Sequence, residues 1–134
     1  MTRREAERQY HSVYWLPVLA FAAHIAEEYP RFPEWATRHF GATSRAWYVY
    51  SHVPLVFFVI AIAAFAEKAP PQSVWPLLAT AIQWVLATNA IFHLVTTRLF
   101  REYSPGVVTG TLLFLPTTAY VFWRTLDASL LTPT

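Results

Sequence analysis

Hydrophobic side chains gather into four long runs along the chain, and short polar segments separate these runs. The runs cover residues 12–29, 46–66, 74–99 and 105–124. Each has at least the roughly 18 residues at which an apolar stretch becomes long enough to cross a ~30 Å hydrocarbon layer. The core of a soluble protein would seldom contain four such runs in 134 residues. The pattern predicts an all-α fold, a four-helix polytopic transmembrane bundle in which residues 1–134 form a single integral-membrane domain.

The connection between the first two runs is too polar to cross a membrane. It extends from Arg31 to Arg45 and contains Phe32, Trp35 and Phe40. Segments that combine charges with large aromatic side chains are typical of helices that lie in the headgroup region of a bilayer. We therefore expect an interfacial loop or helix between the first and second transmembrane helices.

The last run begins with signals for both helix formation and close packing. Ser104 is a suitable N-cap residue, with Pro105 at the first helical position. Gly106 and Gly110 lie four residues apart, a spacing that lets a neighbouring helix approach closely. We expect the fourth helix to pack tightly against its neighbours at this end.

The overall composition agrees with a membrane location and narrows the chemistry. Hydrophobic residues make up 55% of the chain and charged residues 13%, with a net charge of +2. The arginines flank the apolar runs, where anionic membrane lipids are the expected partners. Nucleic-acid binding is not expected, because no basic patch alternates with base-stacking aromatic side chains. The chain has no cysteine, which excludes disulfides, thiolate ligands and cysteine nucleophiles.

The positively charged residues do not predict an orientation in the membrane. Five of them lie on the side of the two termini, namely Arg3, Arg4, Arg8, Lys68 and Arg124. Five lie on the opposite side, namely Arg31, Arg38, Arg45, Arg98 and Arg101. Because the positive-inside rule compares these two counts, it gives a tie.

Three histidines in different runs fall at the same predicted depth. His24 and His93 each lie about five residues before the end of their runs, and His52 lies about six residues after the start of its own. At ~1.5 Å per residue, the three rings lie roughly 7–10 Å below the same face of the bilayer. The same layer contains three more polar side chains, Glu27, Glu28 and Asn89. Ionisable groups at membrane depth are costly and usually functional, so this layer is the predicted site.

The residue types in this layer suit a metal centre. Imidazole nitrogens and carboxylate oxygens are ligands for zinc and non-haem iron, and helical bundles build such sites from facing helices. We expect a divalent metal, Zn or Fe, with the ligands His24, Glu27, His52 and His93. Glu28 would move a proton. Asn89 would be a weak ligand, or it would orient a histidine or the substrate. A metal with an open position would polarise water or oxygen. This indicates a membrane-embedded hydrolase or oxidoreductase that acts on a lipid-like or apolar substrate.

Each of these residues also has a structural interpretation. A single histidine on an apolar helix is more often a hydrogen-bonded packing element than a ligand, and this holds most strongly for His52. Glu28 would then mark the water boundary at the end of the first helix. Asn89 would hold two helices together through its amide, as such side chains commonly do in membranes.

Two other functions fit the same layer. In a metal-free isomerase or cyclase of a lipid or isoprenoid, Glu27 or Glu28 would protonate an alkene, and His24 or His93 would take a proton back. Aromatic side chains would stabilise the cationic intermediate. A metal-binding accessory or transport protein ranks lower, because few polar residues continue from this layer toward the other face. A monomer and a homo-oligomer that completes the site between chains both stay open.

The polar elements also match a family pattern in the right order. His24, Glu27 and Glu28 form a His-x-x-Glu-Glu motif, Asn89-x-x-x-His93 follows, and Ser104-Pro-Gly comes last. With these elements the chain resembles the HXXEE family of small bacterial integral membrane proteins over nearly its whole length. The resemblance implies a four-helix protein of the bacterial inner (cytoplasmic) membrane with metal-dependent chemistry. It does not indicate a substrate.

Overall fold

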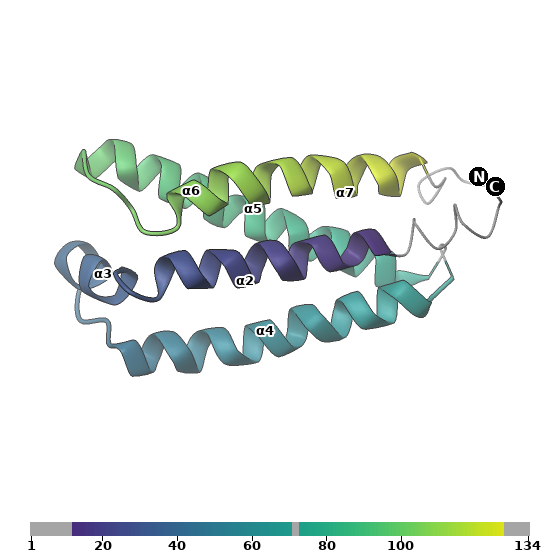
Figure 1. The fold of residues 1–134 in the computed structure, drawn as a ribbon, viewed down its shortest axis with the longest axis horizontal. Helices are drawn as coiled ribbons and strands as arrows, with labels where there is room; N and C mark the ends of the chain where they lie inside the picture. The colour runs from purple at the N-terminus through teal and green to yellow at the C-terminus, as the bar shows by residue number, and fades with distance from the viewer. Residues whose placement is uncertain (1–11, 71–72, 128–134) are drawn as a thin grey trace.

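The protein is a bundle of antiparallel helices with one short helix at its end (Figure 1). The computed structural model describes residues 12–70 and 73–127. In chain order these form η1 (Val13–Trp15), α2 (Leu16–Glu28), α3 (Phe32–Phe40), α4 (Arg45–Lys68), α5 (Val74–Phe100), α6 (Val107–Thr109), the π-helical turn η2 (Gly110–Phe114) and α7 (Leu115–Asp127). The described residues contain no strand, so the predicted all-α class is confirmed.

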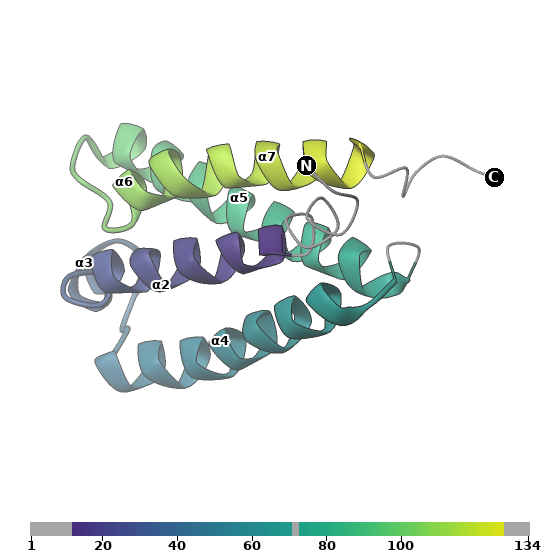
Figure 2. The ribbon, with the colours of Figure 1, turned by 45° about the vertical axis from the view of Figure 1, so that its right-hand side comes forward.

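Helix α2 lies in the middle of the bundle. Figures 1 and 2 show it between α4 on one side and the α6–α7 stretch on the other, with α5 behind. The C-terminal end of α2 therefore points toward the same end of the bundle as the start of α4, the end of α5 and the start of α6. Residues from all four segments meet at this end.

Two of the predicted spans are long and apolar enough to cross a membrane, within the residues that the structure describes. Helix α4 has 24 residues with a mean hydropathy of 2.1, and α5 has 27 residues with a mean hydropathy of 1.5. The first predicted run forms η1 and the 13-residue α2, and the π-helical turn η2 interrupts the last run. The arrangement with four spans stays a prediction. Arg3, Arg4 and Arg8, which enter the orientation count, lie outside the described residues.

Helix α3 covers the end of the bundle at which α2 stops. It has Pro33 in its first turn, and Gly41 follows its last residue. The φ of Gly41 is 111°, a backbone conformation that glycine adopts more readily than other residues. Its Trp35 is only 2% exposed. A hydrogen bond of 2.6 Å joins Nε2 of His39 to Oε1 of Glu102, in the loop that follows α5. His39 and a neighbouring arginine hold the pKa of Glu102 below its usual range. A helix thus forms in the segment that was expected to contain an interfacial helix or loop.

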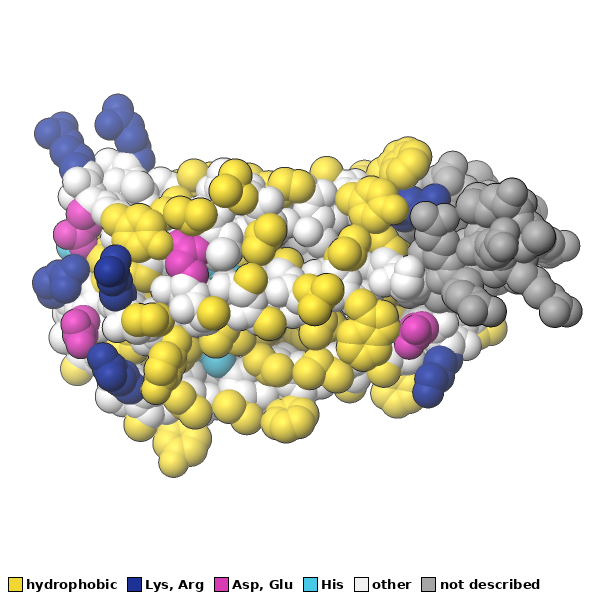
Figure 3. All heavy atoms as spheres, viewed as in Figure 1, with side chains coloured by type: hydrophobic (Ala, Val, Ile, Leu, Met, Phe, Trp, Pro, Cys, Tyr) yellow, Lys and Arg dark blue, Asp and Glu magenta, His cyan; other side chains and the backbone are white. Residues whose placement is uncertain are grey.

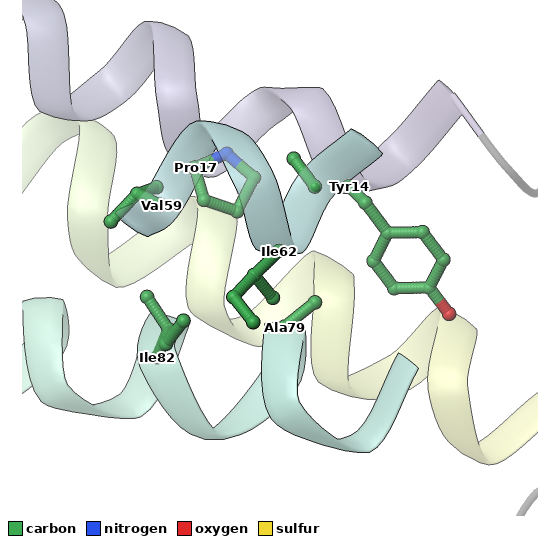
Figure 4. A pocket seen from close by; sticks show the side chains of 7 residues that line it. Tyr14, Pro17, Val59, Ile62, Ala79 and Ile82 are labelled. Atoms are coloured by element: carbon green, nitrogen blue, oxygen red, sulfur yellow. The ribbon is translucent and has the colours of Figure 1, made fainter. Parts of the chain in front are cut away.

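The half of the bundle away from α3 has an apolar interior. This half contains a small void of about 10 Å³. The void is lined by Tyr14, Pro17, Val59, Ile62, Ala63, Ala79 and Ile82 (Figure 4). Its size is close to that of one water molecule, and aliphatic side chains dominate its wall.

Between α5 and α7, Gln83 donates to Thr118 at 2.7 Å, and the hydroxyls of Thr80 and Thr125 lie 3.0 Å apart. These side chains join two helices through buried hydrogen bonds.

Gly110 allows the closest approach between η2 and α5. A Cβ atom at this position would lie 3.1 Å from the Cα atom and 3.2 Å from the Cβ atom of Ala90. The predicted tight packing of the fourth helix near Gly106 and Gly110 is therefore confirmed.

Ser104 does not cap the helix that follows it, so that prediction is wrong. The residue before α6 is Gly106, with φ of 106° and no side-chain cap. The hydroxyl of Ser104 lies 2.9 Å from Nδ1 of His93 and 3.1 Å from the hydroxyl of Thr96. Because these two contacts hold it against α5, the Ser104 side chain is not the cap of α6.

Replacing Gly110 by leucine is expected to destabilise the fold by about 1–3 kcal/mol, because overpacking against the Ala90 backbone outweighs the gain in helix propensity. The measurement is chemical unfolding of the purified protein. The control is Ala81→Leu on an exposed face of α5, which should change the stability by no more than about 0.5 kcal/mol. Equal stability of the two variants would contradict the close contact.

Candidate metal centre

The carboxylate of Glu28 lies between histidine rings from three helices. His24 and Glu28 occupy positions i and i+4 of α2, so both side chains project from one face. Oε1 of Glu28 lies 3.4 Å from Nε2 of His24 and 3.0 Å from Nε2 of His93 on α5. Its other oxygen lies 3.6 Å from Nε2 of His52 on α4. The structure thus brings together the three imidazoles that the sequence placed in one layer.

These groups are taken almost completely out of solvent. His24 and His93 are 0% exposed, and Glu28 is 2% exposed. Nε2 of His24 and Nε2 of His93 have no hydrogen-bond partner among the described residues. Buried polar atoms are nearly always satisfied, and exceptions call for an explanation such as an ion. Two unpartnered nitrogens beside a buried carboxylate are such an exception.

The spacing of the three ligand atoms suits a small cation. Three ligand atoms, one from each of His24, Glu28 and His93, lie within 4.8 Å of one another. Ligand atoms at about 2.0–2.2 Å from a tetrahedral ion lie roughly 3.3–3.6 Å apart. The two distances from the Glu28 oxygen to the nitrogens, 3.4 and 3.0 Å, are close to this range, and the two nitrogens lie within 4.8 Å of each other. The residues present therefore fit a divalent metal ion.

Hydroxyl groups hold the opposite nitrogen of each buried ring. Nδ1 of His24 lies 2.8 Å from the hydroxyl of Thr109, at the end of α6. Nδ1 of His93 lies 2.9 Å from the hydroxyl of Ser104. Histidine ligands commonly have such an outer partner, which fixes the direction of the ring. Both hydroxyls come from the segment between α5 and η2, so this segment orients both rings.

Helix α4 contributes a tyrosine and the third histidine. The hydroxyl of Tyr48 donates to Oε2 of Glu28 at 2.7 Å. The ring of His52 stacks on Tyr48 with centroids 3.8 Å apart, and its Nδ1 lies 2.8 Å from the Tyr48 carbonyl oxygen. The His52 side chain is 19% exposed. His52 is thus the histidine of this group with access to the surroundings.

Glu27 points away from the histidines although it precedes Glu28 in the chain. Its carboxylate accepts hydrogen bonds from the backbone N–H groups of Gly106, Val108 and Thr109, at 3.1, 3.1 and 2.7 Å. It also accepts from the hydroxyls of Thr109 and Tyr103. Free N–H groups and the dipole at a helix N-terminus favour an anion there. Glu27 therefore supplies the cap of α6 that Ser104 was expected to supply.

Tyr103 keeps its proton over the physiological range. Partial burial and the Glu27 carboxylate raise the pKa of its hydroxyl to about 12. The hydroxyl thus stays a donor to Glu27, and it ties the loop after α5 to the end of α2.

The predicted roles of Glu27 and Glu28 differ from these positions. The sequence placed Glu27 among the metal ligands and Glu28 as the proton-transfer group, but Glu28 lies between the rings. Successive residues of a helix point about 100° apart, so the two carboxylates contact different neighbours. Asn89 is partly buried on α5, and its Oδ1 has no hydrogen-bond partner among the described residues. Its predicted role stays a prediction.

Four further residues of the site bond to its histidines and glutamates: Thr109 contacts His24, Tyr48 contacts Glu28, Tyr103 contacts Glu27, and Ser104 contacts His93. The sequence pattern did not predict these contacts. Tyr48 had a partial signal, because it lies four residues before His52 and therefore on the same face of α4. The other three act through contacts between distant parts of the chain.

Gly106 leaves room for both buried rings. A Cβ atom here would lie 2.6 Å from Cε1 of His24 and 2.8 Å from Cε1 and Nε2 of His93. Any larger side chain would displace the rings or the loop. The glycine is therefore required by space as well as by its positive φ of 106°.

We expect Gly106→Ala to destabilise the fold more than Gly41→Ala does. Both glycines have similar positive φ values, 106° and 111°, but a Cβ at Gly41 meets nothing within 4 Å. Backbone strain of about 1–3 kcal/mol should appear in both variants, and overpacking should add about 1–3 kcal/mol at Gly106 alone. Chemical unfolding of both variants measures the difference. An equal loss would show that the histidine rings do not restrict Gly106.

Comparison with known proteins places the chain in a family. No curated protein and no solved structure matches it. A family model described as "Protein of unknown function with HXXEE motif" matches residues 15–121. The match includes His24, Glu27 and Glu28, which form the motif at the end of α2, and it extends through α5 and most of α7. The chain therefore belongs to the HXXEE family.

Proposed function

We propose that this protein is a membrane-embedded, metal-dependent enzyme that holds one divalent ion between His24, Glu28 and His93. The observation that carries the proposal is the pair of buried Nε2 atoms without hydrogen-bond partners on either side of a buried carboxylate oxygen. An unpaired buried charge is costly, and a cation between these groups would offset it. No other group of three histidine or acidic side chains with such geometry occurs in residues 12–70 and 73–127.

The set of ligands favours zinc or iron. Two histidines and one carboxylate are the protein ligands of zinc hydrolases and also of non-haem iron oxygenases. Either ion, when bound, would act as a Lewis acid with positions open to water or substrate. The ligands therefore support a hydrolase or an oxidoreductase, and they do not distinguish between the two.

The remaining polar groups have distinct tasks in this proposal. Tyr48 donates to the second oxygen of Glu28 and so holds the carboxylate in one orientation. Nδ1 of His52 faces the Tyr48 carbonyl, which can only accept, so Nδ1 donates and Nε2 is free to take a proton. Because His52 is also partly exposed, we assign proton exchange with the surroundings to His52. This differs from its predicted role as a ligand.

The surface supports a location in the membrane. Large hydrophobic side chains cover much of the visible surface, and charged ones gather toward the two ends (Figure 3). In an apolar segment of 18 residues within α4, only 22% is buried inside the protein. Phe57 is 69% exposed and Leu19 is 66% exposed. Apolar surface of this extent favours contact with lipid, with α2, α4, α5 and the α6–α7 stretch as the four spans. The inner membrane of a bacterium is proposed on the family resemblance alone.

A pocket beside the centre supports a lipid-like substrate. It has a volume of about 330 Å³ and is lined by Tyr29, Arg45, Ala46, Val49 and Tyr50. Tyr29 follows Glu28 directly, and its ring lies 6.0 Å from that of Tyr48. Apolar walls next to a guanidinium suit an amphiphile with an anionic headgroup. We therefore propose an apolar or amphiphilic small molecule from the bilayer as the substrate.

A metal-free acid–base isomerase is the second candidate. Both oxygens of Glu28 face imidazole nitrogens, and Tyr48 adds a hydroxyl. Such a group can give a proton to an alkene and take one back without an ion. Transport ranks lower, because the fully buried Phe114 packs against His24 with ring centroids 4.5 Å apart on the side toward the apolar half.

Metal analysis of the purified protein tests the first candidate. We expect one zinc or iron per chain, and loss of the ion in His24→Ala, Glu28→Ala and His93→Ala. The affinity should fall by more than the ~10–100-fold that outer hydrogen-bond partners are worth. His52→Ala and the control His39→Ala should keep the ion, because neither removes a ligand atom of the group.

A wild-type protein that stays metal-free after incubation with zinc and with ferrous iron would overturn this proposal. Deuterium transfer from solvent to an alkene lipid by that metal-free protein would then favour the isomerase. Bound metal without hydrolysis or oxidation of any bilayer lipid would point to an accessory role.

The membrane location predicts a position-dependent cost of charge. Phe57→Lys introduces a charge near the middle of α4, where a lysine costs about 2.5–3.5 kcal/mol in membrane insertion. We expect this variant to accumulate less in the membrane fraction. Trp47→Lys, in the first turn of α4 and 57% exposed, should accumulate normally because its charge reaches the headgroups. Recovery of wild type and both variants in the soluble fraction would contradict the location.

A further inference from the structure

We propose that Glu27 and Thr109 are positioning residues that fix the protonation of the His24 ring, with the proton on Nδ1 and the lone pair of Nε2 directed at Glu28. This order of donors and acceptors follows from the contacts of the three side chains. Its effect on metal affinity rests on the proposed metal centre, whereas the protonation of the ring does not.

The chain of contacts begins at Glu27, which acts only as an acceptor. Backbone N–H groups can only donate, and three of them point at its carboxylate from Gly106, Val108 and Thr109. The helix that starts at α6 adds the positive end of its dipole. The carboxylate is therefore held as an anion that receives a hydrogen bond from each neighbour.

The Thr109 hydroxyl passes this constraint to the ring. A hydroxyl has a single proton, and Thr109 donates it to Oε2 of Glu27 at 2.5 Å. Toward His24, the Thr109 hydroxyl oxygen can therefore act only as an acceptor. Because it lies 2.8 Å from Nδ1 of His24, that nitrogen must donate, and it therefore carries the proton of the neutral ring.

The other nitrogen of His24 is thereby left ready for a cation. In a neutral imidazole with a protonated Nδ1, Nε2 has a lone pair and no proton. This Nε2 lies 3.4 Å from a carboxylate oxygen of Glu28, without a hydrogen bond. In the neutral ring this lone pair and the carboxylate repel each other, and the repulsion is removed by a metal cation between them or by a second proton on the ring. Metals bind only unprotonated histidine nitrogens. The contacts from Glu27 through Thr109 to His24, called the relay below, therefore prepare the ring as a ligand.

His93 shows that this order is specific to His24. Its Nδ1 contacts Ser104, whose hydroxyl is 3.1 Å from the hydroxyl of Thr96. Thr96 donates to Ser104, and neither of these two partners of Ser104 is an anion, so the Ser104 proton is able to point toward Nδ1 of His93 or away from it. The contacts of His93 therefore permit both neutral forms, whereas those of His24 permit one.

Nitrogen NMR of the metal-free protein tests the proposal directly. The 15N chemical shifts of a histidine ring identify the protonated nitrogen, and a His24→Gln variant assigns the His24 signals. We expect wild type to carry the proton on Nδ1 of His24, and Thr109→Ser to preserve this form. Thr109→Val removes the acceptor, so the proton should move to Nε2. Zinc affinity, measured by competition with a chromophoric chelator, should then fall about 10–100-fold.

Thr118→Val is the matched control. Thr118 is another threonine of the last helical stretch; it is buried, and it bonds to Gln83. This variant should keep the wild-type protonation of His24 and the wild-type zinc affinity, even if its stability is lower.

Two results would overturn the proposal, and both are separable from failure of the metal centre. A wild-type ring that carries a proton on Nε2, alone or together with one on Nδ1, would overturn it, even if Thr109→Val does not fold. A Thr109→Val ring identical to that of wild type would do the same. If His24 has the predicted protonation but the protein binds no zinc, the relay is supported and the proposed function is contradicted. If the protein binds zinc but His24 has the opposite protonation, only the relay is contradicted.

Discussion

The structure depends on one buried carboxylate and the groups that surround it. Glu28 is 2% exposed, and its two oxygens contact three imidazole nitrogens and a tyrosine hydroxyl from α2, α4 and α5. A buried charge of this kind is tolerated only when it is paired and hydrogen-bonded. The helices therefore meet at this end of the bundle, where Nε2 of His24 and Nε2 of His93 have no hydrogen-bond partner among the described residues.

The adjacent carboxylate performs a different and complementary task. Glu27 receives the backbone N–H groups at the start of α6, while Glu28 faces the histidines. The His-x-x-Glu-Glu motif thus joins the end of α2 to two separate features, the N-terminus of the last helical stretch and the ring cluster. Thr109 connects the two features because it contacts both Glu27 and His24. Thr109 thus links Glu27 to the His24 ring through its hydroxyl.

The two halves of the bundle differ in what holds them together. Aliphatic clusters and buried threonine and glutamine hydrogen bonds fill the half around Ile62 and Val121. The other half contains the polar cluster under α3, whose Trp35 is 2% exposed. A cover of this kind excludes water from the cluster, which strengthens its electrostatic interactions. On the side of α4, the His52 side chain is 19% exposed, and the pocket that includes Tyr29 is lined by residues of the first two turns of the same helix.

Local periodicity was enough to predict the helices and the shared layer of His24, His52 and His93, because helical rise and run length are properties of a single segment. The same reasoning predicted the close approach at Gly110, since small residues four apart act locally. It did not assign Glu27 and Glu28 correctly to their neighbours. The side of α2 that faces each neighbouring helix depends on how the helices rotate and pack, which no single segment contains. Thr109, Ser104 and Tyr103 joined the site for the same reason: each contacts a residue that lies far away in the sequence or on another element, and only the tertiary structure brings them together.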